Sequence, residues 1–169
     1  MRARRAREGD VEAIHALIAH YAERGLLLPR TLEEVREHVA RFLVLVDEEK
    51  VQGCVALEPY GPDLAEVRSL AVSEEMQGHG AGARLLEFAL AVAKRRKIAR
   101  VFAVTHAPEF FARQGFHATS RHAVPEKIAR DCNTCPKAPT CELLAVVKVI
   151  IPVRVALPVL PAERAVPVA

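Results

Sequence analysis

A glycine-rich turn between residues 73 and 82 carries the clearest chemical signal in the sequence. An apolar, strand-like run ends at Val72, a helix-like run follows the turn, and Gly78, Gly80 and Gly82 stand at alternate positions. Glycine lets an anion come close to the backbone, and the N–H groups at the start of a helix bind phosphate. The segment therefore predicts a cradle for a pyrophosphate group.

Two well-known phosphate-binding motifs do not fit this turn. No Lys-Ser or Lys-Thr pair follows Gly82, as a P-loop requires, and no strand–helix–strand unit with a ribose-binding acid follows, as a dinucleotide fingerprint requires. A glycine turn by itself also serves as a tight connection between a strand and a helix. The phosphate interpretation therefore needs support from the surrounding sequence.

Three of the four cysteines, Cys132, Cys135 and Cys141, are clustered, and Cys54 stands apart. Three thiolates with His122 or Cys54 could form a tetrahedral zinc site, and Cys132 and Cys135 could form a reversible disulfide. A second Cys-x-x-Cys pair, which would favour zinc, is missing. We expect no metal and a local structural role, with zinc and a disulfide as the alternatives.

Composition and charge exclude several classes of protein. The chain has 169 residues, of which 51% are hydrophobic and 27% charged, which fits one folded domain rather than a disordered chain. No apolar run approaches the roughly 18 residues that cross a membrane, and the basic start lacks the apolar stretch of a signal peptide. The net charge of +3 is too small to indicate nucleic acid, and the Lys94–Lys97 cluster suits a helix end. We expect a cytoplasmic protein with reduced cysteines and no membrane or nucleic-acid partner.

Strand and helix signals alternate along the chain. Thr31 with Glu34 forms a capping box, Asp10 is a candidate cap for an earlier helix, and Gly115 is a candidate left-handed helix end. The pattern predicts an α+β fold, a mixed and mainly antiparallel sheet with helices on both faces. The expected strands cover residues 2–6, 42–47, 51–57, 65–72, 100–105, 116–121 and 144–151, and the expected helices residues 10–21, 31–40, 80–97 and 109–114. Residues 1–151 would form the domain, and the proline- and valine-rich residues 152–169 an appended extension.

The context of the glycine turn resembles the acetyl-CoA motif of the GNAT N-acetyltransferase superfamily. Gln77, Gly80 and Gly82 supply its Gln-x-x-Gly-x-Gly pattern, after a Leu-Ala-Val strand. A second block, from Phe110 to Phe116, resembles the superfamily's Phe-Tyr-x-x-x-Gly-Phe. The resemblance extends over about residues 2–150. It implies the GNAT acyl-CoA N-acyltransferase fold and transfer of acetyl from acetyl-CoA to an amine.

Within that superfamily the chain is similar to the short-form N-acetylglutamate synthases. The similarity lies in residues 27–34, 66–72, 109–111 and 125–136. It implies that acetyl passes to the α-amino group of L-glutamate, for arginine biosynthesis, by direct attack in a ternary complex. The alternatives are another acceptor, such as glutamine, a polyamine or a protein amine, or a non-catalytic acyl-CoA sensor.

The resemblance also implies roles for residues around the turn. It makes Glu66 the candidate catalytic base that takes the proton of the amine, with an ion pair to Arg68 as the alternative. The main chain of Leu70, Ala71 and Val72 would contact pantetheine, and an N–H of Ala71 or Val72 would bind the thioester oxygen. The pyrophosphate would contact Gln77, Gly78, His79, Gly80, Ala81 and Gly82.

A glutamate acceptor brings two carboxylates, which need cations. Arg30, Arg68 and Lys127 are the candidate acceptor-binding residues, with Ser69 as a neutral donor. Arginine presents the bidentate fork that a carboxylate prefers. A small amino acid is therefore the expected partner, and the strand at residues 144–151 could pair edge to edge in a homodimer.

The tyrosine that usually meets the leaving thiolate is replaced by Phe111, and we expect Tyr21 and Tyr60 to lie elsewhere. A thiolate with a pKa near about 8.5 leaves without full protonation, so the replacement weakens the mechanism only modestly. His106, at a strand end, is a candidate proton shuttle, with a structural cap as the alternative.

Overall fold

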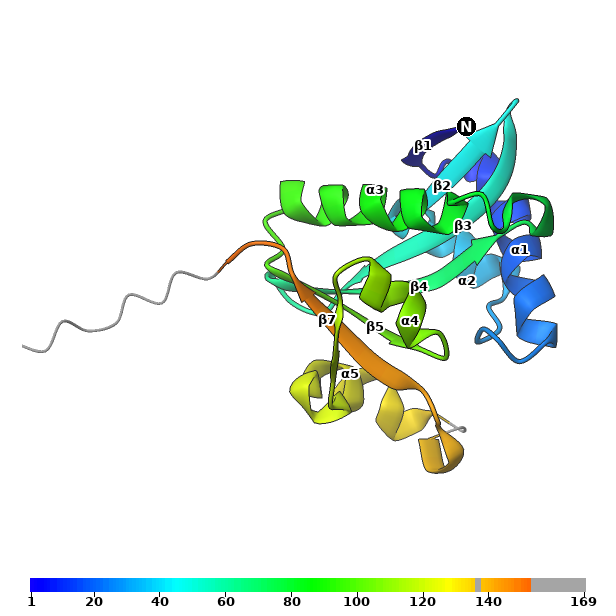
Figure 1. Ribbon diagram of the computed structural model, residues 1–169. Helices are drawn as coiled ribbons and strands as arrows, with labels where there is room; N and C mark the ends of the chain where they lie inside the picture. Colours follow the sequence, from blue (N-terminus) through cyan, green and yellow to red (C-terminus); the bar gives the residue numbers. More distant parts are fainter. Residues whose placement is uncertain (136–137, 153–169) are drawn as a thin grey trace, which may run out of the picture.

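The computed structural model describes residues 1–135 and 138–152, so residues 153–169 of the expected extension lie outside the described residues. A seven-stranded sheet in the order β1-β2-β3-β4-β5-β7-β6 forms its centre (Figure 1). Only β4 and β5 run parallel among the described strand pairs; the other neighbours are antiparallel. The α+β prediction is therefore confirmed. The strands are β1 (Arg2–Arg5), β2 (Phe42–Asp47), β3 (Lys50–Pro59), β4 (Leu64–Val72), β5 (Arg100–Thr105), β6 (His117–Thr119) and β7 (Leu144–Val149).

Helices cover both faces of the sheet, as expected. They are α1 (Val11–Glu23), α2 (Leu32–Glu37), α3 (Ala81–Arg95), α4 (Pro108–Arg113) and α5 (Pro125–Arg130). Alternate residues of a strand point to opposite faces of the sheet, so one strand contributes side chains to the packing on both faces. None of the helices in the described part of the chain is long and apolar enough to cross a membrane.

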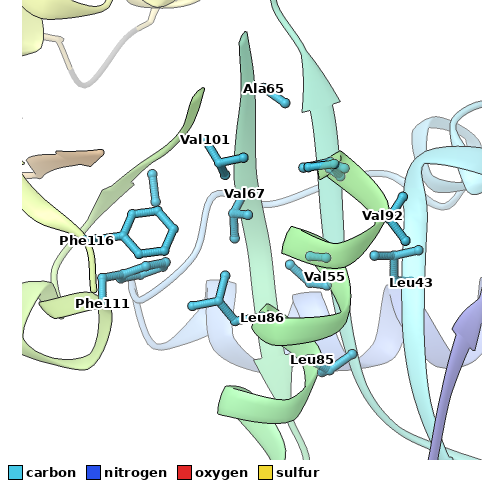
Figure 2. Packing of buried hydrophobic residues seen from close by; sticks show 14 of the residues in the cluster. Leu43, Val55, Ala65, Val67, Leu85, Leu86, Val92, Val101, Phe111 and Phe116 are labelled. Atoms are coloured by element: carbon cyan, nitrogen blue, oxygen red, sulfur yellow. The ribbon is translucent and has the colours of Figure 1, made fainter. Parts of the chain in front are cut away.

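The larger core lies under α3 and α4 (Figure 2). Leu85, Leu86, Ala89 and Val92 all face inward from α3, as the helical spacing predicted. They pack on the alternate strand residues that share this face, Leu43, Leu45, Val55, Leu57, Ala65, Val67, Val101 and Ala103. This packing fixes α3, and with it the end of the glycine turn, against the centre of the sheet.

The opposite face carries two smaller cores. One packs α1 and α2 on β2 and β3, around Ile14, Ile18 and Val44. The other lies beyond β4, around Leu64, Phe102 and Val124. The polar residues Glu58, Glu66 and Arg68 occupy this same face between the two cores, because they alternate with buried apolar residues along β3 and β4.

Local signals at the helix ends were mostly confirmed. The Glu34 N–H donates to Thr31 Oγ1 at 3.1 Å and Glu34 Oε2 accepts from the Thr31 N–H at 2.7 Å, which is the predicted capping box. Gly115 has a φ of 79°, as its predicted place after α4 requires. Asp10 precedes α1, but its carboxylate pairs with Arg4 at 2.6 Å and accepts from the Arg7 N–H. It therefore ties β1 to the turn before α1 instead of capping that helix.

Three expectations need correction. The helix predicted to reach residue 40 ends at Glu37 and continues as a separate turn of 3₁₀-helix, Val39–Arg41. The strand expected at 116–121 is only the three residues of β6. The strand expected to offer a dimer edge, β7, lies between β5 and β6, and β6 pairs with its residues Ala145–Val147, so the middle of β7 is not an open edge.

Candidate functional site

The strands β4 and β5 pair over three residues and then separate. Their parallel register runs from Leu64 with Arg100 to Glu66 with Phe102. Beyond that point a cleft of about 500 Å³ lies between their carboxyl-terminal halves. On the side of β5, the backbone of β4 has no strand partner along the cleft, so its N–H and C=O groups are available to an extended ligand. The cleft is lined by Tyr21, Leu26, Leu27, Val67, Arg68, Ser69, Leu70, Ala71, Val72, Gln77, Gly82, Ala103, Val104, Thr105, His106, Ala107, Phe110 and Phe111.

The glycine turn joins β4 to α3 at one end of this cleft. Gly78 and Gly80 have φ angles of 74° and 76°, in the left-handed region that side chains avoid. No side chain caps the first turn of α3. Its N–H groups therefore stay open to a ligand, and the helix dipole favours an anion there. This geometry fits the predicted pyrophosphate cradle.

Two side chains of the turn have bonds of their own. The Gln77 amide donates from Nε2 to the Tyr21 hydroxyl at 2.6 Å, so this side chain is turned toward α1. His79 is exposed, and its Nδ1 lies 2.8 Å from the carbonyl oxygen of Gln77. The backbone of the turn, rather than these side chains, is therefore the part that is open to a ligand.

A β-bulge interrupts the pairing of β4 with β3 next to the cleft. Cys54 pairs with Ala71 and Ala56 with Arg68, so one extra residue of β4 stands opposite Val55. Ser69 takes up the irregularity with a φ of 52°, rare for a residue with a side chain. The Cys54 thiol donates to the Ser69 carbonyl over 3.6 Å. The bulge exposes Ser69 both to the cleft and to the polar pocket described next.

A small polar pocket of about 20 Å³ adjoins the cleft. Arg68 and Ser69 line both cavities, and Arg30 lines the pocket from the segment before α2. Three of the four predicted acceptor-binding residues are therefore brought together. The pocket is lined by Arg30, Glu34, Val35, His38, Arg41, Phe42, Ala56, Glu58, Arg68 and Ser69. Of its titratable residues, sequence reasoning did not predict Glu34, His38, Arg41 or Glu58 as site residues.

Glu58 lies at the floor of the polar pocket and is 2% exposed. Its carboxylate accepts from Arg41 at 2.6 Å, from Arg68 at 2.9 Å and from Arg130. Burial by itself would raise the pKa of Glu58, but the hydrogen bonds from Arg41 and Arg130 outweigh it and hold that pKa below its usual value. Glu58 is therefore ionised at neutral pH and holds Arg68 in place.

The fourth predicted acceptor-binding residue, Lys127, lies outside both cavities. Its Nζ is 2.9 Å from Glu66 Oε2 and 2.7 Å from Asp131 Oδ2. The Tyr60 hydroxyl lies within hydrogen-bond distance of the same two carboxylates and donates to one of them at a time. This group fixes α5 on the sheet, and the charge of Lys127 is already balanced by Glu66 and Asp131.

Glu66 was the candidate catalytic base, and the structure places it in an ion cluster outside both cavities. Its side chain is buried, lines neither the cleft nor the polar pocket, and is engaged by Lys127 and Tyr60. The alternative, an ion pair with Arg68, has the longer distance of 4.0 Å. Alternation along β4 places Glu66 on the face under α5, and Glu66 with Phe102 is the last residue pair before the strands part.

Residue 111, where the family usually has the tyrosine that meets the leaving thiolate, is a phenylalanine on α4. Phe111 is buried and stacks edge to face on Phe116 at 5.2 Å (Figure 2). His106 is exposed at the end of β5 and lines the cleft, which fits its predicted place near the thioester. Tyr21 also lines the cleft, against the expectation that it lies elsewhere.

The cysteine cluster forms no cross-link or metal centre in the described residues. All four thiols are free. Within residues 1–135 and 138–152, no three Cys, His, Asp or Glu side chains are grouped as metal ligands, so the zinc alternative gains no support. Burial also raises the pKa of the Cys132 thiol, which makes it a poorer nucleophile.

Comparison with known proteins identifies relatives of this chain. It matches the Acetyltransferase (GNAT) family over residues 11–116. An uncharacterized N-acetyltransferase of Chlorobaculum tepidum is 40% identical over 147 residues, which are 87% of this chain and 95% of that protein. An amino-acid acetyltransferase of Mycobacterium tuberculosis is 42% identical over 116 residues, 67% of this chain and 66% of that protein.

A solved structure shares the fold as well as the sequence. The N-acetylglutamate synthase from Neisseria gonorrhoeae, complexed with coenzyme A and N-acetyl-glutamate, superimposes with a TM-score of 0.81 at 32% identity. The match covers 88% of this chain but 35% of that one, so this chain spans about a third of that synthase. The cleft, the glycine turn and these relatives agree: the chain belongs to the GNAT acetyltransferase family and is an enzyme that uses acetyl-CoA.

Proposed function

We propose that this enzyme transfers acetyl from acetyl-CoA to the α-amino group of L-glutamate, and that the N-acetyl-L-glutamate it makes serves arginine biosynthesis. The observation that carries the proposal is the meeting of Arg30, Arg68 and Ser69 where the polar pocket adjoins the cleft. The likeness to a synthase that binds coenzyme A and N-acetyl-glutamate supports it.

Charge favours a carboxylate in the polar pocket. Arg41, Arg68 and Arg130 pair with Glu58, and Arg68 and Arg130 also lie 3.7 Å and 3.5 Å from Asp131. With Lys127 and Glu66 the cluster has four cations and three carboxylates, so it keeps a net positive charge. Arg30 makes no ion pair with any residue in the described part of the chain. A polyamine would meet repulsion from these cations, whereas an acid gains charge-assisted hydrogen bonds.

The size of the pocket limits how the acceptor binds. A volume of about 20 Å³ holds a group the size of a water molecule and not a whole amino acid. We infer that one carboxylate enters this pocket while the amine and the remaining atoms lie in the adjoining cleft. The amine then approaches β4 close to Ser69, where the two cavities meet.

The reaction needs the cleft to hold acetyl-CoA along β4. The backbone groups of Leu70, Ala71 and Val72 that point away from β3 would pair with pantetheine, and the turn from Gly78 to Gly82 would hold the pyrophosphate. An N–H of Ala71 or Val72 would donate to the thioester oxygen as it gains charge. These roles fit an unpaired strand edge that runs into an uncapped helix start.

Direct attack accounts for all atoms. The neutral amine of glutamate attacks the thioester carbonyl carbon, a C–N bond forms, and the C–S bond breaks with both electrons on sulfur. Glu66 does not line the cleft, so the amine proton passes to water in the open cleft. The coenzyme leaves as a thiolate, and His106, which is exposed and lines the cleft, would return a proton to it.

Product detection by mass spectrometry tests the acceptor. The protein is mixed with acetyl-CoA and a panel of L-glutamate, L-glutamine, other amino acids and polyamines. We expect N-acetylglutamate to form faster than every other product. Faster acetylation of glutamine or of a polyamine would overturn the glutamate assignment, and bound acetyl-CoA with no product would indicate a sensor.

Two arginine variants test the pocket. Arg30→Ala should raise the KM for glutamate by about 10-fold or more, the value of a lost hydrogen bond to a charged group, and leave the KM for acetyl-CoA unchanged. Arg68→Ala should do the same, at some cost in stability from its pair with Glu58. Arg36→Ala is the matched control, since Arg36 lies on α2 but pairs with exposed Glu8 and Glu12. An unchanged KM for glutamate in Arg30→Ala would remove the pocket from the acceptor site.

A further inference from the structure

Tyr21 connects two backbone segments that border one end of the cleft. Its hydroxyl donates to the carbonyl oxygen of Val72 at 2.5 Å and accepts from Nε2 of Gln77 at 2.6 Å. Val72 is the last residue of β4, and Gln77 leads into the glycines of the turn. One phenol near the end of α1 therefore spans the segment between the pantetheine edge and the pyrophosphate turn.

The turn has little else to hold it at its glycines. A Cβ built on Gly78 or Gly80 would meet nothing within 4 Å, so nothing packs on that side of either glycine, although Ser73 and Met76 anchor the start of the turn. Glycine backbone also loses more conformational freedom than other residues when it is fixed. Without a tether, acetyl-CoA would have to order the turn as it binds.

A second link joins the same helix end to the same turn. Glu74 accepts from Arg24 at 2.6 Å and lies 3.2 Å from His20 Nε2. These groups are exposed, and exposed ion pairs contribute little. Tyr21 is 9% exposed, so its two hydrogen bonds are the stronger tether.

We propose that Tyr21 is a positioning residue for acetyl-CoA. It fixes the glycine turn relative to the end of β4, so that one ligand engages both without first ordering the turn. Tyr21 acts through Gln77 and Val72 and has no chemical role in acetyl transfer. This role concerns acetyl-CoA alone and does not depend on the identity of the acceptor.

Binding measurements on Tyr21→Phe test the proposal without any acceptor. The dissociation constants of CoA and of pantetheine, which lacks the pyrophosphate, are measured by calorimetry and by competition. Loss of two hydrogen bonds should raise the Kd of CoA by about 5- to 30-fold. Pantetheine affinity should change less than about twofold, because it does not reach the turn. An unchanged Kd for CoA, or equal weakening of both ligands, would overturn the proposal.

Tyr60→Phe is the matched control, since Tyr60 bonds to Glu66, Asp131 and Lys127 and not to the turn. It should leave both dissociation constants unchanged. Gln77→Ala supplies the second test. If Gln77 acts through Tyr21, the variant that carries both Tyr21→Phe and Gln77→Ala has a Kd for CoA no higher than the higher of the two single-variant values. Effects that multiply would mean that Gln77 contacts CoA directly, which would contradict the tether.

Discussion

The guanidinium of Arg68 lies 2.9 Å from the carboxylate of Glu58 on the neighbouring strand, and Arg68 reaches both the cleft and the polar pocket. Arg41 and Arg130 bind the same carboxylate. A buried anion with three guanidinium partners fixes their positions. Together with Lys127, Glu66 and Asp131 the cluster has four cations and three carboxylates, so it keeps a net positive charge that favours another carboxylate. The floor of the proposed acceptor site is therefore an ion cluster and not a set of independent charges.

Glu58→Gln should damage this floor. The change leaves three guanidinium groups around a neutral amide, and breaking a buried ion group costs on the order of 3 kcal/mol of unfolding free energy. Urea unfolding at pH 7 measures this loss. Glu12→Gln is the control, because its exposed pair with Arg36 at 3.0 Å should cost less than about 0.5 kcal/mol. Equal losses in the two variants would show that Glu58 has no special place.

Gly80→Ala should weaken CoA binding. Gly80 has a φ of 76°, and the left-handed conformation costs a residue with a Cβ roughly 1–2 kcal/mol. Relaxation of this strain would turn the N–H groups away from the pyrophosphate, so we expect the Kd of CoA to rise by about 10-fold. Gly9→Ala is the control, since Gly9 has open space and an ordinary φ. Calorimetric titration that finds equal CoA affinity in the two variants would contradict the predicted cradle.

Stability should fall as the solution becomes acidic. The hydrogen bond from Arg4 lowers the pKa of Asp10 below 3.8, and hydrogen bonds from Lys127 and Tyr60 overcome burial to lower the pKa of Asp131. The pKa of Glu58 is likewise below its ordinary 4.5. A lowered pKa in the folded state means that the unfolded chain takes up protons first, so stability is full above about pH 5 and is lost below it. Urea midpoints between pH 7 and pH 3 should fall steadily, and less steeply in Asp10→Asn; a flat profile would contradict these ion pairs.

The four thiols should react in two groups. Cys54 is fully buried, and burial raises its pKa to about 12, so almost no thiolate exists at pH 8. The clustered cysteines are partly exposed. An aromatic disulfide reagent at pH 8 should modify three thiols in the native protein and the fourth only after denaturation. Cys54→Ala should remove the thiol that reacts only after denaturation. Rapid reaction of all four thiols in the native protein would instead show that β3 is open to solvent.

Much of the fold could be predicted because local patterns decide it. The strands at residues 42–47 and 100–105 match the prediction to the residue, since each is a short apolar run bounded by turn signals. The glycine turn could be predicted because positive φ angles at Gly78 and Gly80 require glycine, which is visible in the sequence. The order of β7 and β6 could not be read, because it depends on pairing between distant segments.

The candidate site was harder to predict, since its polar contacts join residues far apart in sequence. The helix α5 was missed because none of its residues is fully buried, so it has no apolar stripe; a proline at its first turn was the available signal. Lys127 on that helix pairs with Glu66, 61 residues away. Tyr21 follows helical spacing as an ordinary core residue, and nothing in that spacing indicates its bonds to Val72 and Gln77.

Glu66→Gln separates a catalytic base from a buried ion pair. A general base contributes 10²- to 10⁴-fold, and its loss would also remove the acidic limb of the plot of kcat/KM against pH. Because Glu66 is buried against Lys127 and Tyr60, we expect a lower urea midpoint, a fall in kcat of less than about 10-fold, and an acidic limb at the same pH. Lys127→Met removes the same pair from the other side and should give the same pattern. A fall in kcat of a hundredfold or more in Glu66→Gln alone, with the limb gone and stability kept, would restore Glu66 as the base and require its carboxylate to reach the cleft.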